Sequence, residues 1–254
     1  MRILITNDDG INGYGLFLLA NHLKKYGEVI IVAPDTEKSA SSHSIILRNN
    51  ISFKKTNIIT GFEAYEISGT PVDCVRLAVS ILGDFDIVFS GINNGLNIGT
   101  DIIYSGTVAA AREGYIEGIP SVAISTDYQN FECVEKSLDE LLNYIINNKI
   151  YSKDYVLNVN YPVKKASIKG YKFCKMGKKR FKTKFEKRDN NMYAPISNDI
   201  TYDTNQNTDV YLADRGYITF VPLFVDMTNE EALNILRNKK YLKAYELALK
   251  KWTV

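Results

Sequence analysis

Histidine and cysteine are scarce in this chain, and their scarcity limits the chemistry that the sequence can support. The 254 residues include two histidines and three cysteines. Cys74, Cys133 and Cys174 are odd in number and form no CxxC pair, so neither a disulfide framework nor a cysteine-ligated zinc site is expected. They are interpreted as free, mostly structural thiols. Zinc would otherwise need histidine ligands, and only His22 and His43 are present.

Long apolar runs and an excess of one charge are also missing. No run approaches the length of a membrane span, and the first apolar segment meets Asp8 and Asp9 too early for a signal-peptide core, so we expect a cytoplasmic protein without a membrane partner. Lys and Arg number 31 against 29 Asp and Glu, a net charge of +2, which gives no reason to expect a nucleic-acid partner. The basic run 178–184 is an RNA-binding alternative, but a solvated hairpin is the simpler interpretation.

The first 160 residues alternate short apolar runs with helical patterns, which predicts an α/β fold with a mostly parallel sheet flanked by helices. Strands are expected at 2–6, 28–33, 86–90, 121–125 and 155–159, and helices at 14–26, 71–82 and 134–148. The polar triplet 48–50 between β-prone flanks predicts a hairpin inserted in this order.

The character of the sequence changes near residue 162. Beyond it come the basic run, alternating residues at 217–224 and a helical pattern at 229–251, for which Thr228 and Glu231 form a capping box. We therefore predict an α/β core at 1–162 and a C-terminal extension of β-hairpin arms and a helix at 163–254 that packs on this core. Its alternating segments would be edge strands that need cover, so we predict that the extension packs on partner subunits.

Oxygen-bearing side chains gather where three predicted strands end. The first strand is followed by Asp8 and Asp9, the second by the hydroxyl-rich segment 39–44, and the fourth apolar segment by a loop that contains Asn93. Asp-Asp-Gly alone is usually a solvated turn. Adjacent carboxylates repel each other unless a cation or hydrogen-bond donors neutralise them, and parallel sheets bind ligands at these strand ends. Oxygen ligands favour Mg²⁺, Mn²⁺ or Ca²⁺, and the absence of an EF-hand pattern makes calcium storage an unfavoured interpretation.

The loop at 90–104 and the helix start that follows it suit a phosphate or a hard cation. Gly91, Gly95 and Gly99 alternate with carboxamides and lead into an alanine-rich helix opened by Ser-Gly-Thr at 105–107. Glycines allow backbone N–H groups to approach a ligand, and a helix N-terminus presents unpaired donors. The glycine spacing of four matches neither a P-loop nor a dinucleotide-binding fingerprint.

Taken together, these motifs resemble the SurE family of survival-protein nucleotidases. The resemblance rests on Ile-Thr-Asn-Asp-Asp-Gly at 5–10, Ala-Pro-Asp at 33–35, Ser-Gly-Thr-Pro-Val-Asp-Cys-Val at 68–75, the stretch 90–106, and further similarity at 158–162, 208–209, 216–218 and 222–223. It implies a Rossmann-like fold with a C-terminal extension used in dimers or tetramers. It also implies a divalent-metal-dependent phosphatase of nucleoside 5′- and 3′-monophosphates, sometimes active on short polyphosphate.

The resemblance assigns roles to residues at matching positions. One divalent cation per subunit, Mg²⁺ or Mn²⁺, would be held by Asp8, Asp9, Ser39 and Asn93, and the phosphate by Asn97, Ser105, Gly106 and Thr107. One departure concerns 39–44, where the family usually has Ser-Gly-Ala-Ser-Asn-Ser and this chain has Ser-Ala-Ser-Ser-His-Ser. We expect Ala40 to restrict this loop and His43 to contact the substrate or alter the pH optimum.

The predicted reaction is phosphomonoester hydrolysis by a water that the cation and a carboxylate activate. Asp9 is predicted to lie closest to the attacking water and Asp8 to act chiefly as a ligand, although the reverse assignment stays open. Two alternatives remain. Asp9 acts as a nucleophile through a covalent phospho-intermediate, or the chain is a nucleotide-binding regulator that uses the same anion loop without turnover.

Overall fold

The structure is a computed structural model that describes residues 1–163, 167–202 and 204–238, with the side chains at 197–199 also outside the described set. The chain divides into two compact units, 1–223 and 224–254. Among the described residues, the first unit holds both sheets and the helices α1 to α6, and the second contains α7 (Glu230–Asn238). No helix in the described ranges is long and apolar enough to cross a membrane.

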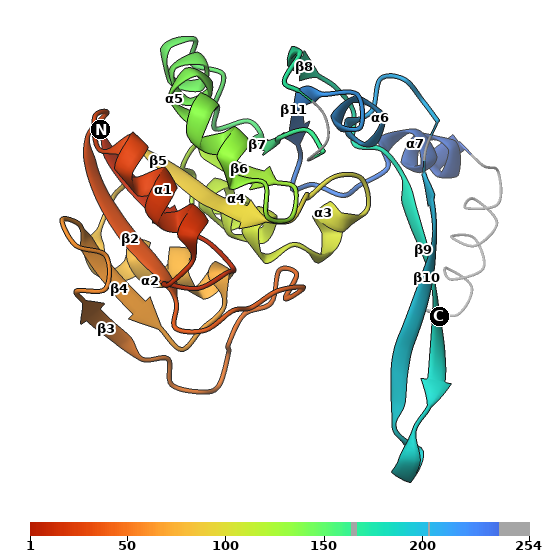
Figure 1. Ribbon diagram of the computed structural model, residues 1–254, viewed down its shortest axis with the longest axis horizontal. Helices are drawn as coiled ribbons and strands as arrows, with labels where there is room; N and C mark the ends of the chain where they lie inside the picture. The colour runs from red at the N-terminus through yellow and green to blue at the C-terminus, as the bar shows by residue number, and fades with distance from the viewer. Residues whose placement is uncertain (164–166, 203, 239–254) are drawn as a thin grey trace, which may run out of the picture. The chain divides into compact units, whose positions relative to one another are not determined.

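A nine-stranded sheet forms the centre of the first unit (Figure 1). Its order is β3-β4-β2-β1-β5-β6-β7-β11-β8. The strands are β1 (Arg2–Thr6), β2 (Glu28–Pro34), β3 (Phe53–Thr56), β4 (Glu63–Ile67), β5 (Ile87–Asn94), β6 (Ser121–Thr126), β7 (Val156–Asn160), β8 (Gly170–Phe173) and β11 (Tyr217–Leu223). Within the described part of this sheet, only the β3–β4 and β7–β11 pairs are antiparallel. The predicted α/β fold with a mostly parallel sheet is confirmed.

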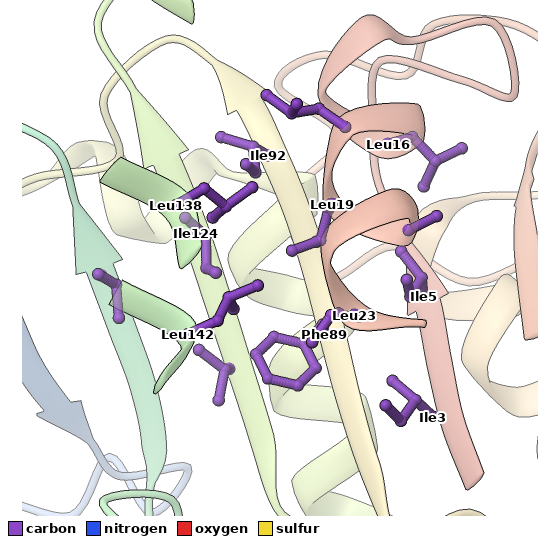
Figure 2. Close-up of a cluster of buried hydrophobic side chains, with 14 of the residues drawn as sticks. Ile3, Ile5, Leu16, Leu19, Leu23, Phe89, Ile92, Ile124, Leu138 and Leu142 are labelled. Atoms are coloured by element: carbon purple, nitrogen blue, oxygen red, sulfur yellow. The ribbon is translucent and has the colours of Figure 1, made fainter. Parts of the chain in front are cut away.

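Two hydrophobic cores cover the two faces of this sheet, because side chains alternate along a strand. Ile3 and Ile5 of β1 contribute to one core, and Leu4 between them contributes to the other. Figure 2 shows the first core, where β1, β5 and β6 meet α1 (Tyr14–Leu23) and α5 (Phe131–Asn147). The second lies against α2 (Pro71–Leu82) and α4 (Gly106–Ile116). Strands buried on both faces explain the continuous apolar runs in the sequence.

The central sheet continues past the boundary that the sequence predicts at residue 162. β11 pairs with β7, and β8 pairs with β11, so residues 170–223 belong to the same compact unit as the core. A second sheet of two antiparallel strands, β9 (Lys179–Lys187) and β10 (Tyr193–Tyr202), forms the predicted hairpin of the basic run. Because strand pairing joins residues distant in sequence, a change in composition does not mark the edge of the sheet.

The predicted hairpin is present, but its turn lies elsewhere. β3 pairs with β4, so the turn falls at 57–62, and the triplet 48–50 lies before the hairpin. Phe53 of β3 stacks on Tyr65 of β4 with ring centroids 4.6 Å apart, and this cross-strand pair favours the observed register.

The capping residue of α7 also differs from the prediction. Asn229, rather than Thr228, accepts a hydrogen bond from Ala232 N at 2.8 Å. Thr228 N donates to the Asp226 carboxylate, also at 2.8 Å. Asn caps helices as well as Thr does, so the sequence allowed either start. The predicted continuation of this helix to residue 251 lies outside the described residues.

Candidate active site

The loops that follow β1, β2 and β5 surround a cavity of about 430 Å³. β1 pairs with β2 on one side and β5 on the other, and all three run parallel, so their carboxyl ends meet at one edge. The cavity is lined by Asp8, Asp9, Glu37, Ser39, Ala40, Asn93, Asn94, Asn97, Asp101, Tyr104, Ser105 and Tyr128. The structure thus brings together all four predicted metal ligands and two of the predicted phosphate ligands.

Asp8 is buried and held by the start of α4. The Thr107 hydroxyl donates to Asp8 Oδ1, and the Asp8 carbonyl accepts from Lys38 N at 2.7 Å. Gly106 packs against the same carboxyl group, because a Cβ at this position would lie 2.9 Å from Asp8 Cβ and 2.7 Å from Ser41 Oγ. Burial raises the pKa of Asp8 above its ordinary value, and the Thr107 hydrogen bond opposes this rise. Gly106 and Thr107, predicted to hold phosphate, therefore position Asp8 in this structure.

Asp9 lies beside Asp8 and accepts a hydrogen bond from Asn94 N at 3.2 Å. Burial, followed by the charge of Asp8, raises the pKa of Asp9 to about 6. Four carboxylates line the cavity, and its lining contains no Lys or Arg. An anion cannot approach such a surface favourably unless a cation first offsets the negative charge.

The hydroxyl and carboxamide of the predicted ligand set have oxygen atoms suited to a cation. Asn93 Nδ2 donates to Gly95 O at 2.7 Å, which leaves the amide oxygen as a ligand atom. Ser39 Oγ donates to Glu37 Oε1 at 2.6 Å and keeps its lone pairs for a metal. Within the described residues, no group of three or more His, Cys, Asp or Glu side chains is arranged as a metal site. The donor set of two carboxylates, a hydroxyl and an amide suits Mg²⁺ or Mn²⁺, which bind few protein oxygens and retain water.

A network of buried asparagines holds Asn97 in place. Asn97 N donates to Asn160 Oδ1 at 2.8 Å, and its carbonyl accepts from Asn158 Nδ2 at 2.9 Å and from Asn160 Nδ2 at 3.0 Å. The Asn97 side chain donates to Ser125 Oγ at 2.9 Å, and no partner of its second amide hydrogen is found among the described residues. Sequence reasoning missed Asn158 and Asn160 as supporting residues. Their signal was the presence of two carboxamides on one face of an otherwise apolar strand.

Ser105 begins α4 and also lines the cavity. Its hydroxyl accepts a hydrogen bond from Val108 N at 3.0 Å, which caps the helix. Of the N–H groups of the first helical turn, that of Val108 is used by this cap, and those of Gly106 and Thr107 interact with the Asp8 carboxylate. The phosphate-binding role of this helix start stays a prediction, and in this structure its first donors hold Asp8.

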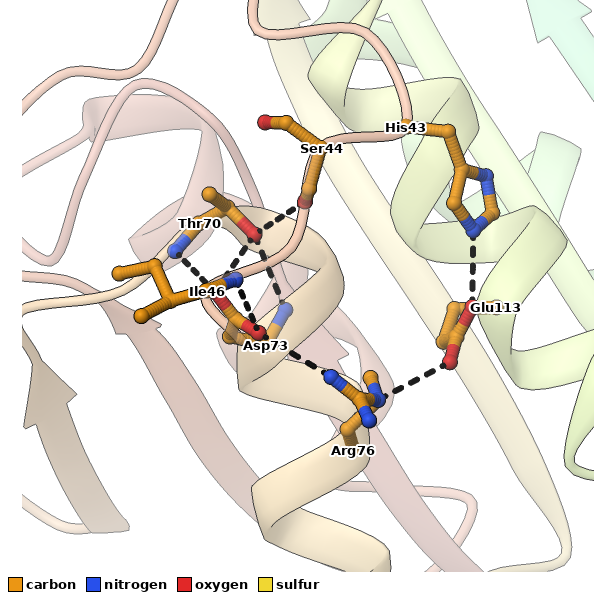
Figure 3. Close-up of polar contacts among 7 residues, drawn as sticks. All are labelled: His43, Ser44, Ile46, Thr70, Asp73, Arg76 and Glu113. Atoms are coloured by element: carbon orange, nitrogen blue, oxygen red, sulfur yellow. Dashed lines mark hydrogen bonds and ion pairs between the residues drawn. The ribbon is translucent and has the colours of Figure 1, made fainter. Parts of the chain in front are cut away.

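His43 lies outside the cavity lining and joins a chain of charged groups (Figure 3). Its Nε2 lies 2.8 Å from Glu113 Oε2, and Arg76 is 3.6 Å from Glu113 and 3.5 Å from Asp73. Asp73 accepts from Thr70 N at the start of α2, so the chain ends in a helix cap. The structure thus gives His43 a contact with α4 through Glu113 and shows none with the cavity.

Ala40, the other departure in this loop, does line the cavity and has a φ of 55°. This is the left-handed region that glycine adopts at little cost and that strains an alanine. The predicted restriction of the loop by Ala40 therefore concerns a backbone conformation that glycine would adopt without strain.

Five lining residues were absent from the predicted site: Glu37, Asn94, Asp101, Tyr104 and Tyr128. Asp101 is paired with Lys179 at 2.5 Å. Asn94 receives a hydrogen bond from Gln129 N at 2.8 Å. These residue types are common on loops, so the sequence does not mark them as site residues. Only the structure shows that they line one cavity.

The chain is similar to known proteins over most of its length. The family described as survival protein SurE matches residues 3–183. The chain is 43% identical over 253 residues to a protein named 5′-nucleotidase SurE from a type A strain of Clostridium botulinum, covering 95% of this chain and 99% of that protein. A relative of the same name from a type E3 strain is 42% identical and covers 92% of this chain and 97% of its own. The crystal structure of the SurE protein from Aquifex aeolicus has a TM-score of 0.78 and 33% identity, covering 96% of this chain and all of that one.

Proposed function

The chain belongs to the SurE family, and on that premise we propose that it is a divalent-metal-dependent phosphatase of nucleoside 5′-monophosphates. Its relatives from C. botulinum bear the name 5′-nucleotidase. Activity on 3′-monophosphates and on short polyphosphate is part of the same proposal.

The observation that carries the proposal is the charge of the cavity. Asp8, Asp9, Glu37 and Asp101 line it, and none of its lining residues is Lys or Arg. A phosphomonoester dianion would be repelled by this surface, whereas a bound divalent cation offsets part of the negative charge and attracts the dianion to the metal. The same edge of the sheet offers the Asn97 amide and the Ser105 hydroxyl as hydrogen-bond donors for phosphoryl oxygens.

We assign one cation, Mg²⁺ or Mn²⁺, to Asp8, Asp9, Ser39 and Asn93. When bound, a cation of this kind acidifies a water ligand and offsets charge on phosphoryl oxygens. Thr107 orients Asp8 through its hydroxyl, and Asn94 N orients Asp9. Asp9, the more accessible of the two carboxylates, is placed to accept a proton from the attacking water.

Donors for the phosphoryl oxygens come from a second group of residues. The Asn97 amide and the Ser105 hydroxyl would hold these oxygens as charge redistributes during the reaction, and Gly106 and Thr107 would keep the Asp8 carboxylate in place. The substrate contact predicted for His43 is not part of this proposal, because its imidazole pairs with Glu113 and lies outside the cavity lining.

Removal of divalent cations is expected to lower phosphate release from AMP by roughly 10²-fold or more, since the acidic cavity then repels its substrate. The measurement is phosphate release from a panel of nucleoside 5′- and 3′-monophosphates, after dialysis against a chelator and after addition of Mg²⁺ or Mn²⁺. Recovery on adding the metal supports the proposal. Equal release with and without the chelator would contradict the assigned metal dependence.

The alternative function is a nucleotide-binding regulator that uses the same anion loop without turnover. The same assay separates the two. Micromolar AMP binding with no phosphate release in either metal would support the regulator.

We also propose that the chain forms a homo-oligomer, a dimer or a tetramer, through its C-terminal extension. In β9 and β10, pairing places Phe181 opposite Ile200 and Phe185 opposite Pro195, on the same face as Tyr193. Phe185 is 62% exposed and Tyr193 61% exposed. A two-stranded ribbon with an open apolar face is marginal alone and gains stability when a partner covers it.

Substitution of Phe185 and Tyr193 together by Ser is expected to reduce the mass in sedimentation equilibrium to that of one chain. A double substitution on the charged face, Lys182→Ser with Lys184→Ser, is the matched control and should leave the mass unchanged. An oligomer that survives the first pair would contradict the role of this face.

A further inference from the structure

Two tyrosine side chains stand out among the residues that line the active-site cavity. Tyr104 is 54% exposed and Tyr128 is 63% exposed, although both border a cavity whose other lining is almost entirely polar. Exposure of an aromatic ring to water is unfavourable in free energy. A ligand with a flat apolar face that covers the ring removes this unfavourable contribution. No ring contact of either tyrosine is found among the aromatic pairs of the described residues.

The backbone of Tyr104 is attached to the loop that carries Ser39. Tyr104 ends the short helix α3 (Asp101–Tyr104), and its carbonyl accepts a hydrogen bond from Ser42 N at 2.9 Å. The neighbouring carbonyl of Ile103 accepts from Ser42 Oγ at 2.8 Å. These two bonds fix the tyrosine relative to a proposed metal ligand.

Tyr128 is attached to the other side of the site. It follows β6 in a turn, and the next residue, Gln129, donates its N–H to Asn94 Oδ1 at 2.8 Å. Asn94 in turn donates its N–H to Asp9. The two tyrosines are therefore positioned by separate loops, and each loop is hydrogen-bonded to a segment that carries a proposed metal ligand or its partner.

We propose that Tyr104 and Tyr128 bind the nucleobase of the substrate by stacking, which is an inference that rests on the proposed nucleotidase function. The lining offers no Lys or Arg to hold the phosphate or sugar, so affinity for the leaving nucleoside must come from other contacts. Stacking of bases on aromatic side chains is strong and tolerates every base, because each base has a π-face. Purines, which have the larger face, should gain more from it than pyrimidines.

The test compares AMP with ribose 5-phosphate, which keeps the sugar and the phosphate but lacks the base. Tyr104→Leu and Tyr128→Leu are each expected to lower kcat/KM for AMP about tenfold, and Tyr104→Phe and Tyr128→Phe to restore it. Turnover of ribose 5-phosphate should change less than twofold in all four variants. Phe17→Leu removes an exposed aromatic ring of α1 that does not line the cavity and serves as the matched control.

Three results would overturn the stacking assignment. These are an unchanged kcat/KM for AMP in both Leu variants, an equal loss for AMP and ribose 5-phosphate, or failure of the Phe variants to restore activity. Binding of AMP in the presence of Mg²⁺, measured by calorimetry, separates this proposal from the proposed function. If wild type releases no phosphate but the Leu variants weaken AMP binding about tenfold, stacking is supported and the nucleotidase function is not.

Discussion

Replacement of Asp9 by Asn is expected to lower metal-dependent phosphate release by roughly 10²- to 10³-fold, the scale seen when one group that stabilises reacting charge is removed. The change removes a negative ligand and the proton acceptor proposed for the attacking water. Its amide keeps the shape of the side chain, so the fold should persist. Initial rates with saturating Mn²⁺ measure the loss.

Stability provides an independent check on this variant. Burial and the neighbouring Asp8 raise the pKa of Asp9 to about 6, above its unfolded value, so ionisation of Asp9 destabilises the folded state as pH rises through that range. At pH 8 this cost is fully present in the metal-free protein, and Asp9→Asn removes it. We therefore expect the Tm of the metal-free variant at pH 8 to equal or exceed that of wild type.

Asp35→Asn is the matched control, since Asp35 follows β2 at the same edge of the sheet but is exposed and outside the cavity lining. It should retain nearly full activity. Full metal-dependent activity in Asp9→Asn, with a normal Tm, would refute the role assigned to Asp9. Detection of phosphate bound covalently to wild type would instead support the nucleophilic route.

Replacement of Gly15 by Ala is expected to destabilise the protein by about 3 kcal/mol, at the upper end of the usual cost of overpacking. A Cβ at Gly15 would lie 1.9 Å from the Ile92 carbonyl oxygen and 2.9 Å from its carbonyl carbon. Both atoms belong to the backbone of β5, so no side-chain rotation relieves the clash, and α1 must move away from the strand. Ile92 immediately precedes Asn93, and phosphate release should therefore fall along with stability.

Thermal unfolding measures this effect, with an expected drop in Tm of roughly 6–12 °C. Gly118→Ala is the control, because a Cβ at Gly118 meets no atom within 4 Å and only its φ of 77° opposes the substitution. That strain costs about 1 kcal/mol and should leave activity unchanged. Equal Tm values for the two variants would contradict the close approach of α1 to β5.

Much of the fold was predictable because its signals are local. The helix at 71–82 was predicted with its bounds, since Thr70, Pro71 and Asp73 form a cap that depends on four consecutive residues. The parallel strands were predicted from short apolar runs. The turn of the β3–β4 hairpin was misplaced because its register depends on the contact of Phe53 with Tyr65, which turn propensity does not encode.

The positions of the candidate site residues at the strand ends were also predictable. Side chains such as Asp8, Asp9 and Asn93 lie at or just beyond the ends of strands. Because the carboxyl ends of parallel strands meet at one edge of the sheet, the order of the strands predicts that these side chains lie close together. The partners of the site residues were not predictable. Thr107 on Asp8 and Asn160 on Asn97 join residues 99 and 63 positions apart.

The sequence by itself determined the types of element, the residues at the strand ends and the resemblance to a family. Only the tertiary structure decided that four carboxylates share a cavity without a Lys or Arg, that His43 pairs with Glu113, and that Tyr104 and Tyr128 face the same space. The physical reason is that secondary structure and capping depend on neighbours a few residues away. Charge balance, pKa values and ligand contacts depend on which distant loops meet, and that is fixed by strand order and packing.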